Sequence, residues 1–214
     1  MNLIELKSTH MGDLLISIGI LCGGRSRRFG SDKYFHNING QTIVELVYDK
    51  FKELTDDIFL QLSNNNKART KMFNFNAKVN YDTVQNKGPL GGIYSVLKHA
   101  KYERTFVIAG DLPFVDRNIL FELQSHAKFQ LVVPKWDNDF VEPLCAIYSK
   151  ALLPLIKTQM ETGDFKISNL YNVIERNYGE IMNIKYININ ELIQCKKISN
   201  GCFKNINYLE DLGH

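Results

Sequence analysis

A cationic segment containing two adjacent glycines follows the first apolar run of the sequence and is the stretch best suited to bind an anion. Residues 21–33 read LCGGRSRRFGSDK. Gly23 and Gly24 can adopt backbone angles closed to other residues, so amide groups there can wrap a phosphate. Several cationic side chains can add charge-assisted hydrogen bonds to phosphoryl oxygens. They are Arg25, Arg27, Arg28 and Lys33. The alternative is a glycine turn beside a solvated basic face.

This loop matches neither of the two common nucleotide-binding motifs. A G-x-x-x-x-G-K-[ST] P-loop cannot be aligned on it, and a G-x-G-x-x-G dinucleotide fingerprint is absent. The formal net charge of the chain is only +3, which is mild for a protein that binds a nucleic-acid backbone. The basic residues therefore point to a small phosphorylated ligand, and nucleic acid is not an expected partner.

Acidic and amide side chains near the ends of apolar segments are the other candidates for chemistry. Asp111 follows an isoleucine- and valine-rich run, where a rigid carboxylate can hold a Mg²⁺ ion that bridges phosphates, or can instead cap the next helix. Asp82 can assist nucleotide binding or simply end a strand. Glu142 precedes a proline and can contact substrate or cap a turn. Asn205 and Asn207 are two apart, so on a strand they would face the same side, where they can bind a polar ligand or simply make a turn.

Apolar runs and helical patterns alternate along the chain, and this order predicts the elements that must position these residues. The expected strands span residues 16–21, 57–63, 77–82, 104–111, 130–135 and 144–149. The expected helices span residues 43–54, where Thr42 and Glu45 have capping-box spacing, 88–100 and 116–127. A polar loop entering a short helix is expected at 64–73, and helices at 151–161 and 165–175 are expected to stand off the main sheet.

This alternation predicts an α/β fold, Rossmann-like, with a mostly parallel central sheet flanked by helices. Ligands of such sheets bind beyond the carboxyl ends of the strands. We expect residues 1–15 to form an N-terminal extension and residues 16–214 to form a single domain. Four scattered cysteines and the lack of a long apolar stretch favour a cytoplasmic protein with reduced thiols and no membrane partner.

The ordered motifs resemble those of the molybdenum cofactor guanylyltransferase (MobA) family of nucleotidyltransferases. The loop is similar to the family signature L-x-G-G-x-S-x-R-M-G-x-D-K. Four later segments extend the resemblance to residue 212: YDTVQNKGPLGGI, VIAGDLPFVD, EPLCAIY and FKNINYLEDL. The cytidylyl sister branch typically has Ala-Gly in place of Gly23 and Gly24 and lacks the Gly-Pro-Leu and Glu-Pro-Leu segments.

The sequence departs from this family pattern at a few positions. Cys22 stands where alanine is usual, Phe29 where methionine is usual, and Gly110 where a cysteine is common. The last motif has Tyr208-Leu209 in place of Thr-Pro, which removes a helix-starting cap and proline beside Asn205 and Asn207. We interpret the changes at 22 and 29 as differences of packing.

The resemblance implies transfer of GMP from GTP to the terminal phosphate of molybdopterin or Mo-molybdopterin, with release of pyrophosphate and with Mg²⁺ as cofactor. It implies catalytic roles for Arg28, Lys33 and Asp111, with Asp111 also the metal ligand, and acceptor contacts from Glu142, Asn205 and Asn207. The implied nucleotide-binding residues are Leu21, Cys22, Gly23, Gly24, Lys33, Asp82, Gly88, Pro89, Leu90 and Asp111.

The N-terminal part of the domain would then bind the nucleotide and the C-terminal part the acceptor. Other cofactor-biosynthesis proteins and apo-molybdoenzymes are the implied protein partners. The alternatives are a cytidylyltransferase, a nucleotidyltransferase for another phosphorylated acceptor such as a sugar phosphate, and a noncatalytic nucleotide-sensing homologue.

Overall fold

Strand β1 lies at the centre of a mixed sheet and has parallel neighbours on both sides. The computed structural model describes residues 15–23, 33–38, 40–64, 75–178 and 181–204. Within them the main sheet has seven strands in the order β5-β4-β1-β6-β8-β7-β9. These strands are β1 (Ser17–Cys22), β4 (Ile58–Leu62), β5 (Lys78–Tyr81), β6 (Arg104–Ala109), β7 (Leu131–Lys135), β8 (Cys145–Ser149) and β9 (Ile184–Asn188).

The pairing register explains why β1 reads as an unbroken apolar run. Ile20 pairs with Leu60 of β4 and with Ile108 of β6, both in parallel register, and every residue of β1 is buried. A strand covered on both faces needs no polar alternation. β8 is antiparallel to β6 and β7, and the other pairs in this sheet are parallel. The expectation of a mostly parallel sheet is therefore confirmed.

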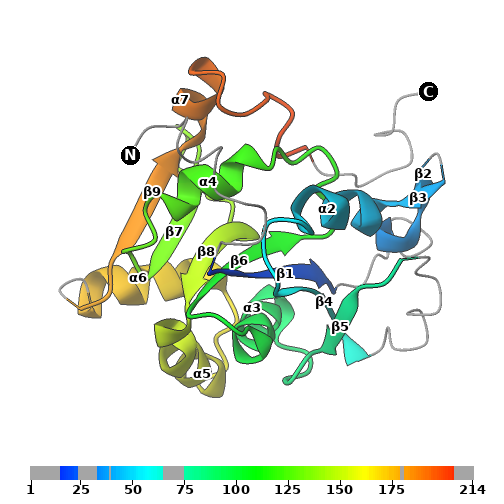
Figure 1. Cartoon of the computed structure of the whole chain (residues 1–214). Helices are drawn as coiled ribbons and strands as arrows, with labels where there is room; N and C mark the ends of the chain where they lie inside the picture. The colour runs from blue at the N-terminus through cyan, green and yellow to red at the C-terminus, as the bar shows by residue number, and fades with distance from the viewer. Residues whose placement is uncertain (1–14, 24–32, 39, 65–74, 179–180, 205–214) are drawn as a thin grey trace.

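Helices cover both faces of the sheet, giving three layers (Figure 1). One face carries α2 (Ile43–Phe51), α4 (Asn118–Gln124) and α7 (Ile189–Gln194). The other carries α3 (Gly88–His99), α5 (Leu153–Glu161) and α6 (Ile167–Asn177). Short 3-10 turns, η1 (Lys33–Phe35) and η3 (Lys150–Leu152), and a small hairpin of β2 (Asn37–Ile38) and β3 (Gln41–Thr42) complete the described elements.

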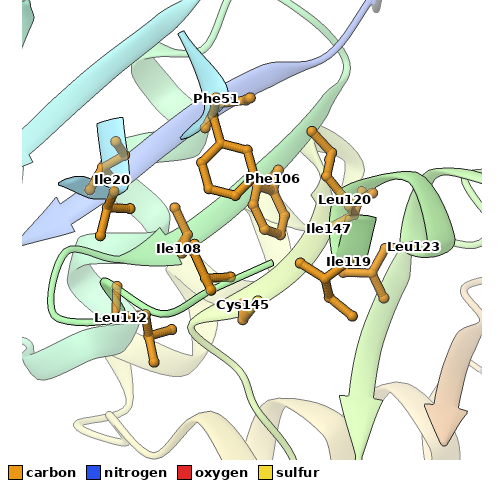
Figure 2. Packing of buried hydrophobic residues seen from close by; sticks show 14 of the residues in the cluster. Ile20, Phe51, Phe106, Ile108, Leu112, Ile119, Leu120, Leu123, Cys145 and Ile147 are labelled. Carbon is orange, nitrogen blue, oxygen red and sulfur yellow. The ribbon is translucent and has the colours of Figure 1, made fainter. Parts of the chain in front are cut away.

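The first face packs through large apolar side chains from helix and strand (Figure 2). Phe51 of α2 and Phe106 of β6 are in tilted ring contact, with centroids 5.5 Å apart. α2 begins at the predicted capping box, where Thr42 Oγ1 accepts from Glu45 N at 3.3 Å and Glu45 Oε2 accepts from Thr42 N at 3.2 Å. The sequence signal for this helix is thus confirmed.

The prediction that the two helices at 151–161 and 165–175 stand off the main sheet is wrong. Ile156 and Ile174 are fully buried in the same cluster as Val133 of β7 and Tyr148 of β8. Their apolar stripes are needed to cover the second face of the sheet, which α3 alone does not reach. β9 and α7 were not predicted, and most of the predicted segment 64–73 lies outside the described residues.

Candidate functional site

The carboxyl ends of β1 and β6 form the centre of the candidate site. From β1 the chain continues to β4 and β5 on one side, and it then crosses to β6 on the other side. In open α/β sheets the ligand crevice lies at the point where the strand order reverses in this way. Gly23 directly follows β1, and Asp111 lies two residues after β6. These two residues therefore flank the expected crevice.

Asp111 is held at this edge by backbone pairing before it and by core packing after it. Gly110 N donates to Leu21 O at 2.9 Å, which extends the β1–β6 pairing beyond the strand end. Leu112 is buried in the same core cluster as Ile108 and Cys145 (Figure 2). Asp111 itself is only 8% exposed. Its backbone has little freedom, as expected for a residue that must hold a charge in one place.

Two buried side chains, Cys22 and Tyr34, lie close enough to Asp111 to feel its charge. Burial, followed by the negative charge of Asp111, raises the pKa of the Cys22 thiol and of the Tyr34 phenol. Both groups therefore stay protonated at neutral pH and add no further negative charge. The Tyr34 hydroxyl donates to Gly23 O at 3.0 Å, so η1 is tied to the end of β1. Tyr34 was not singled out from the sequence, because a tyrosine after a lysine carries no recognisable signal.

Asp82, which follows β5, belongs to a polar network on the α3 side of the sheet. Its Oδ1 accepts from Gln61 Nε2 at 3.1 Å, and Gln61 Oε1 lies 3.1 Å from His99 Nδ1. An amide oxygen can only accept, so the His99 proton is assigned to Nδ1. Burial raises the pKa of Asp82, while Gln61 and His99 lower it in part. Gln61, fully buried in β4, thus fixes the orientation of the Asp82 carboxylate.

The Gly88-Pro89-Leu90 segment begins α3, six residues after Asp82 in the chain. Gly88 has a φ of 60°, which favours glycine, and Pro89 occupies the first turn where its missing N–H is tolerated. Leu90 is fully buried. A Cβ on Gly92 would lie 3.0 Å from Leu21 Cδ2, so the first turns of α3 pack closely against β1. The amide groups at the start of α3 are consequently near the end of β1.

Glu142 reaches the same edge from the opposite chain direction, because it precedes the antiparallel strand β8. Its backbone N donates to Pro134 O at 2.9 Å, and its carboxylate Oε1 accepts from Trp136 Nε1 at 2.8 Å. Burial raises the pKa of Glu142, and the Trp136 hydrogen bond lowers it in part. The tryptophan partner was missed from the sequence, since a hairpin contact across six residues has no pattern of its own.

The three carboxylates lie in a defined order along the sheet edge. With neighbouring strands about 4.8 Å apart, Asp111 and Glu142 lie next to neighbouring strands, β6 and β8, whereas the strands before Asp82 and Asp111, β5 and β6, are three spacings or about 14 Å apart. Among the described residues no group of three or more His, Cys, Asp or Glu side chains could hold a metal ion. A single carboxylate such as Asp111 fits Mg²⁺, which keeps several waters and shares phosphate oxygens with its substrate.

Several predicted site residues lie outside the described part of the chain. These are Gly24, Arg28, Asn205 and Asn207. Lys33 begins η1, and its backbone follows the loop directly. Within the described ranges no helix has the length and apolar character required to cross a membrane.

The arrangement is that of an α/β nucleotidyltransferase: a central strand, a glycine at the switch point and carboxylates on both sides of it. A family model described as "MobA-like NTP transferase domain" matches residues 18–178. The chain belongs to this family. Members of the family generally use a divalent metal ion.

The relatives support the same assignment. A probable molybdenum cofactor guanylyltransferase of Aquifex aeolicus is 31% identical over 84% of this chain and 88% of its own length. A molybdenum cofactor guanylyltransferase of Desulfosudis oleivorans is 34% identical over 72% of this chain and 75% of its own. Molybdopterin-guanine dinucleotide biosynthesis protein A of Archaeoglobus fulgidus superposes with a TM-score of 0.74 at 25% identity, covering 92% of this chain and 94% of its own.

Proposed function

We propose that this protein is a molybdenum cofactor guanylyltransferase, which transfers GMP from GTP to the terminal phosphate of molybdopterin and releases pyrophosphate. The observation that carries the proposal is the order of groups along one sheet edge. Asp82 lies on one side of Gly23, and Asp111 and Glu142 lie on the other. A nucleotide on the first side and an acceptor on the second would bring their phosphates together beside Asp111.

The reaction asks the protein for alignment and charge neutralisation more than for a strong base. The terminal phosphate of the acceptor is already an anion, and it attacks the α-phosphorus of GTP in line with the departing pyrophosphate. In our proposal Arg28 and Lys33 hold the triphosphate and stabilise the charge of the leaving pyrophosphate. Amides near Gly23 and Gly24 bind the nucleotide, together with Leu21 and Cys22. The buried neutral neighbours of Asp111 fit a site that must accept several phosphate charges.

Asp111 is the residue that would hold Mg²⁺ in this proposal. Mg²⁺ prefers oxygen ligands and, when bound, neutralises charge on the phosphates. The rigid backbone on both sides of Asp111 keeps its carboxylate at the end of β6, where it would meet the triphosphate. Asp82, oriented by Gln61, would contact the nucleoside end of GTP, and the Gly88-Pro89-Leu90 segment would line the same pocket.

We assign acceptor binding to the C-terminal part of a single domain that spans residues 16–214. Glu142, Asn205 and Asn207 would contact molybdopterin or Mo-molybdopterin, and other cofactor-biosynthesis proteins and apo-molybdoenzymes would be the partners that supply and receive it. Strands β6 and β8 are neighbours in the sheet, and this supports the division, because Asp111 follows β6 and Glu142 precedes β8 at the same edge.

The test of this mechanism is to measure GTP binding and pyrophosphate release separately for wild type and for Lys33→Ala. We expect the variant to lose about a hundredfold in rate, the cost typical of one missing oxyanion-stabilising group, while it remains folded. Lys157→Ala is the matched control, since Lys157 is an exposed lysine of α5 that pairs with Glu161. Unchanged turnover in folded Lys33→Ala would refute the assigned role. Tight GTP binding without pyrophosphate release by wild type would instead favour a nucleotide-sensing protein.

A further inference from the structure

Trp136, the single tryptophan of the chain, is joined to Glu142 within a short hairpin. The backbone N of Trp136 donates to Phe140 O at 2.8 Å, and Lys135 and Val141 form a bridge. The turn places the indole beside the carboxylate, so Nε1 donates to Glu142 Oε1 at 2.8 Å. A donor to an ionised acceptor gives one of the stronger hydrogen bonds in proteins.

A second contact, outside the hairpin, also holds the indole. Phe203 packs edge-on against it, with ring centroids 5.8 Å apart and an interplanar angle of 71°. The preceding residue, Cys202, accepts from Asp116 N through its sulfur at 3.2 Å. The segment that leads to the predicted acceptor residue Asn205 is thereby joined to the loop after Asp111. The orientation of Trp136 is consequently set by packing as well as by its hydrogen bond.

The hydrogen bond leaves the Glu142 carboxylate with one oxygen occupied and one available. In the described part of the chain no group donates to Oε2, and the side chain is only half-buried. Both backbone polar groups of Glu142 are bonded, N to Pro134 O and O to Cys145 N. The backbone hydrogen bonds and the hydrogen bond from Trp136 therefore fix the position of Glu142. Together they also set the direction in which its second carboxylate oxygen points.

We propose that Trp136 is a positioning residue that fixes Glu142 so that its second carboxylate oxygen accepts N–H groups of the acceptor's pterin ring. This inference rests on the proposed function. A pterin carries an amino group next to a ring N–H, and a carboxylate is a suitable acceptor for such donors. Trp136 acts through Glu142, and Phe203 keeps the indole in place.

The fluorescence of Trp136 tests the contact without any turnover. Other groups near the hairpin that can titrate or carry charge are Lys135, Asp137, Asp139, Lys204 and two thiols that interact electrostatically with Glu142. Those thiols, Cys145 and Cys202, are protonated in the acidic range, since burial raises the pKa of both and that of Cys202 to about 11. We expect emission to change with pH around a midpoint above the ordinary glutamate pKa, and Glu142→Gln to abolish that transition. The same transition in both proteins would overturn the contact.

Binding and kinetic measurements then test whether the Trp136–Glu142 contact serves acceptor binding. We expect molybdopterin to change Trp136 fluorescence in wild type and to bind at least about tenfold more weakly to Glu142→Gln. In assays with GTP, Trp136→Phe should raise the KM for molybdopterin about tenfold and leave the KM for GTP and kcat unchanged. Trp136→His, which restores a ring N–H, should recover part of the loss. Phe140→Leu is the control, because Phe140 is an exposed aromatic of the same hairpin.

Each outcome separates this inference from the proposed function. Wild type that binds molybdopterin through Glu142 but releases no pyrophosphate from GTP would refute the guanylyltransferase and keep the positioning role. Wild type that is active, with Trp136→Phe equal to it in the KM for molybdopterin, would refute the positioning role alone. Equal losses in Trp136→Phe and Phe140→Leu would show a general effect of the hairpin and would also refute it.

Discussion

Replacing Gly110 by alanine should destabilise the fold, because the added Cβ would crowd atoms of β1 and η1. That carbon would lie 3.1 Å from Cys22 Sγ, 3.2 Å from Leu21 O and 3.3 Å from Tyr34 Cδ1. Leu21 O cannot move away readily, since it accepts the Gly110 amide at 2.9 Å. Overpacking of this kind costs about 1–3 kcal/mol of unfolding free energy.

The nearest of those atoms, Cys22 Sγ, suggests how the cost can be relieved. In the family pattern alanine is usual at position 22 and cysteine is common at 110, whereas this chain has cysteine at 22 and glycine at 110. The buried sulfur of β1 thus fills space next to Gly110 that a side chain from position 110 would otherwise enter. We expect Cys22→Ala alone to cost about 1 kcal/mol through the cavity it leaves.

A double-mutant cycle measured by urea unfolding decides whether these two positions share one space. The double variant Cys22→Ala, Gly110→Ala should lose less free energy than the sum of the single variants, by about 0.5–1 kcal/mol. The exchange variant Cys22→Ala, Gly110→Cys should be the most stable of the altered proteins. Strictly additive losses, or a Gly110→Ala variant as stable as wild type, would refute the packing argument.

Three further predictions concern carboxylates and the amide that orients one of them. Asp111→Asn should leave the urea midpoint nearly unchanged but lower GTP-dependent pyrophosphate release by about a hundredfold, measured across a range of Mg²⁺ concentrations. Gln61→Leu should raise the KM for GTP several-fold with little change in the KM for molybdopterin, because Asp82 loses its donor and sits beside an apolar group. Burial raises the pKa of Asp57, but hydrogen bonds from Ser17 and the Lys101 amide, and the Lys78 ammonium, outweigh it and leave the pKa lowered. The Asp57 carboxylate therefore stabilises the fold above the unfolded pKa near 3.9, and this stabilisation is lost as pH falls through the lower, folded pKa. Asp57→Asn should lower the free energy of unfolding at pH 7, and that free energy should fall less steeply toward acid pH than in wild type when both are measured by urea unfolding.

The central strands were predictable because burial on both faces leaves an unambiguous apolar run. β1, β4 and β6 have this composition, and the capping box of Thr42 and Glu45 marks the start of α2. β9 has no such signal. Four of its five residues are only partly buried, since it is the edge strand beside β7. A half-exposed strand of mixed composition cannot be told from a loop by pattern alone.

The candidate site was predictable only where a residue follows a strand that the sequence itself predicts. Asp82 and Asp111 satisfy this rule, and the structure brings them to one edge. Gln61 was treated as part of a strand, because the sequence does not reveal that its amide bonds Asp82. Trp136 was not considered, since its contact with Glu142 depends on the geometry of one hairpin. Sequence patterns identify the elements that deliver functional groups, whereas side-chain partners depend on three-dimensional packing.

The measurement that tests the central claim most directly is the product formed from molybdopterin, Mg²⁺ and each of GTP, CTP and ATP by the purified protein. We predict pyrophosphate release with GTP and a product whose mass equals molybdopterin plus GMP, with CTP and ATP inactive. Release with CTP and a cytidylyl product would contradict the guanylyl assignment while keeping the fold and mechanism. No pyrophosphate release with any of the three nucleotides would contradict the proposed acceptor or the enzymatic function itself.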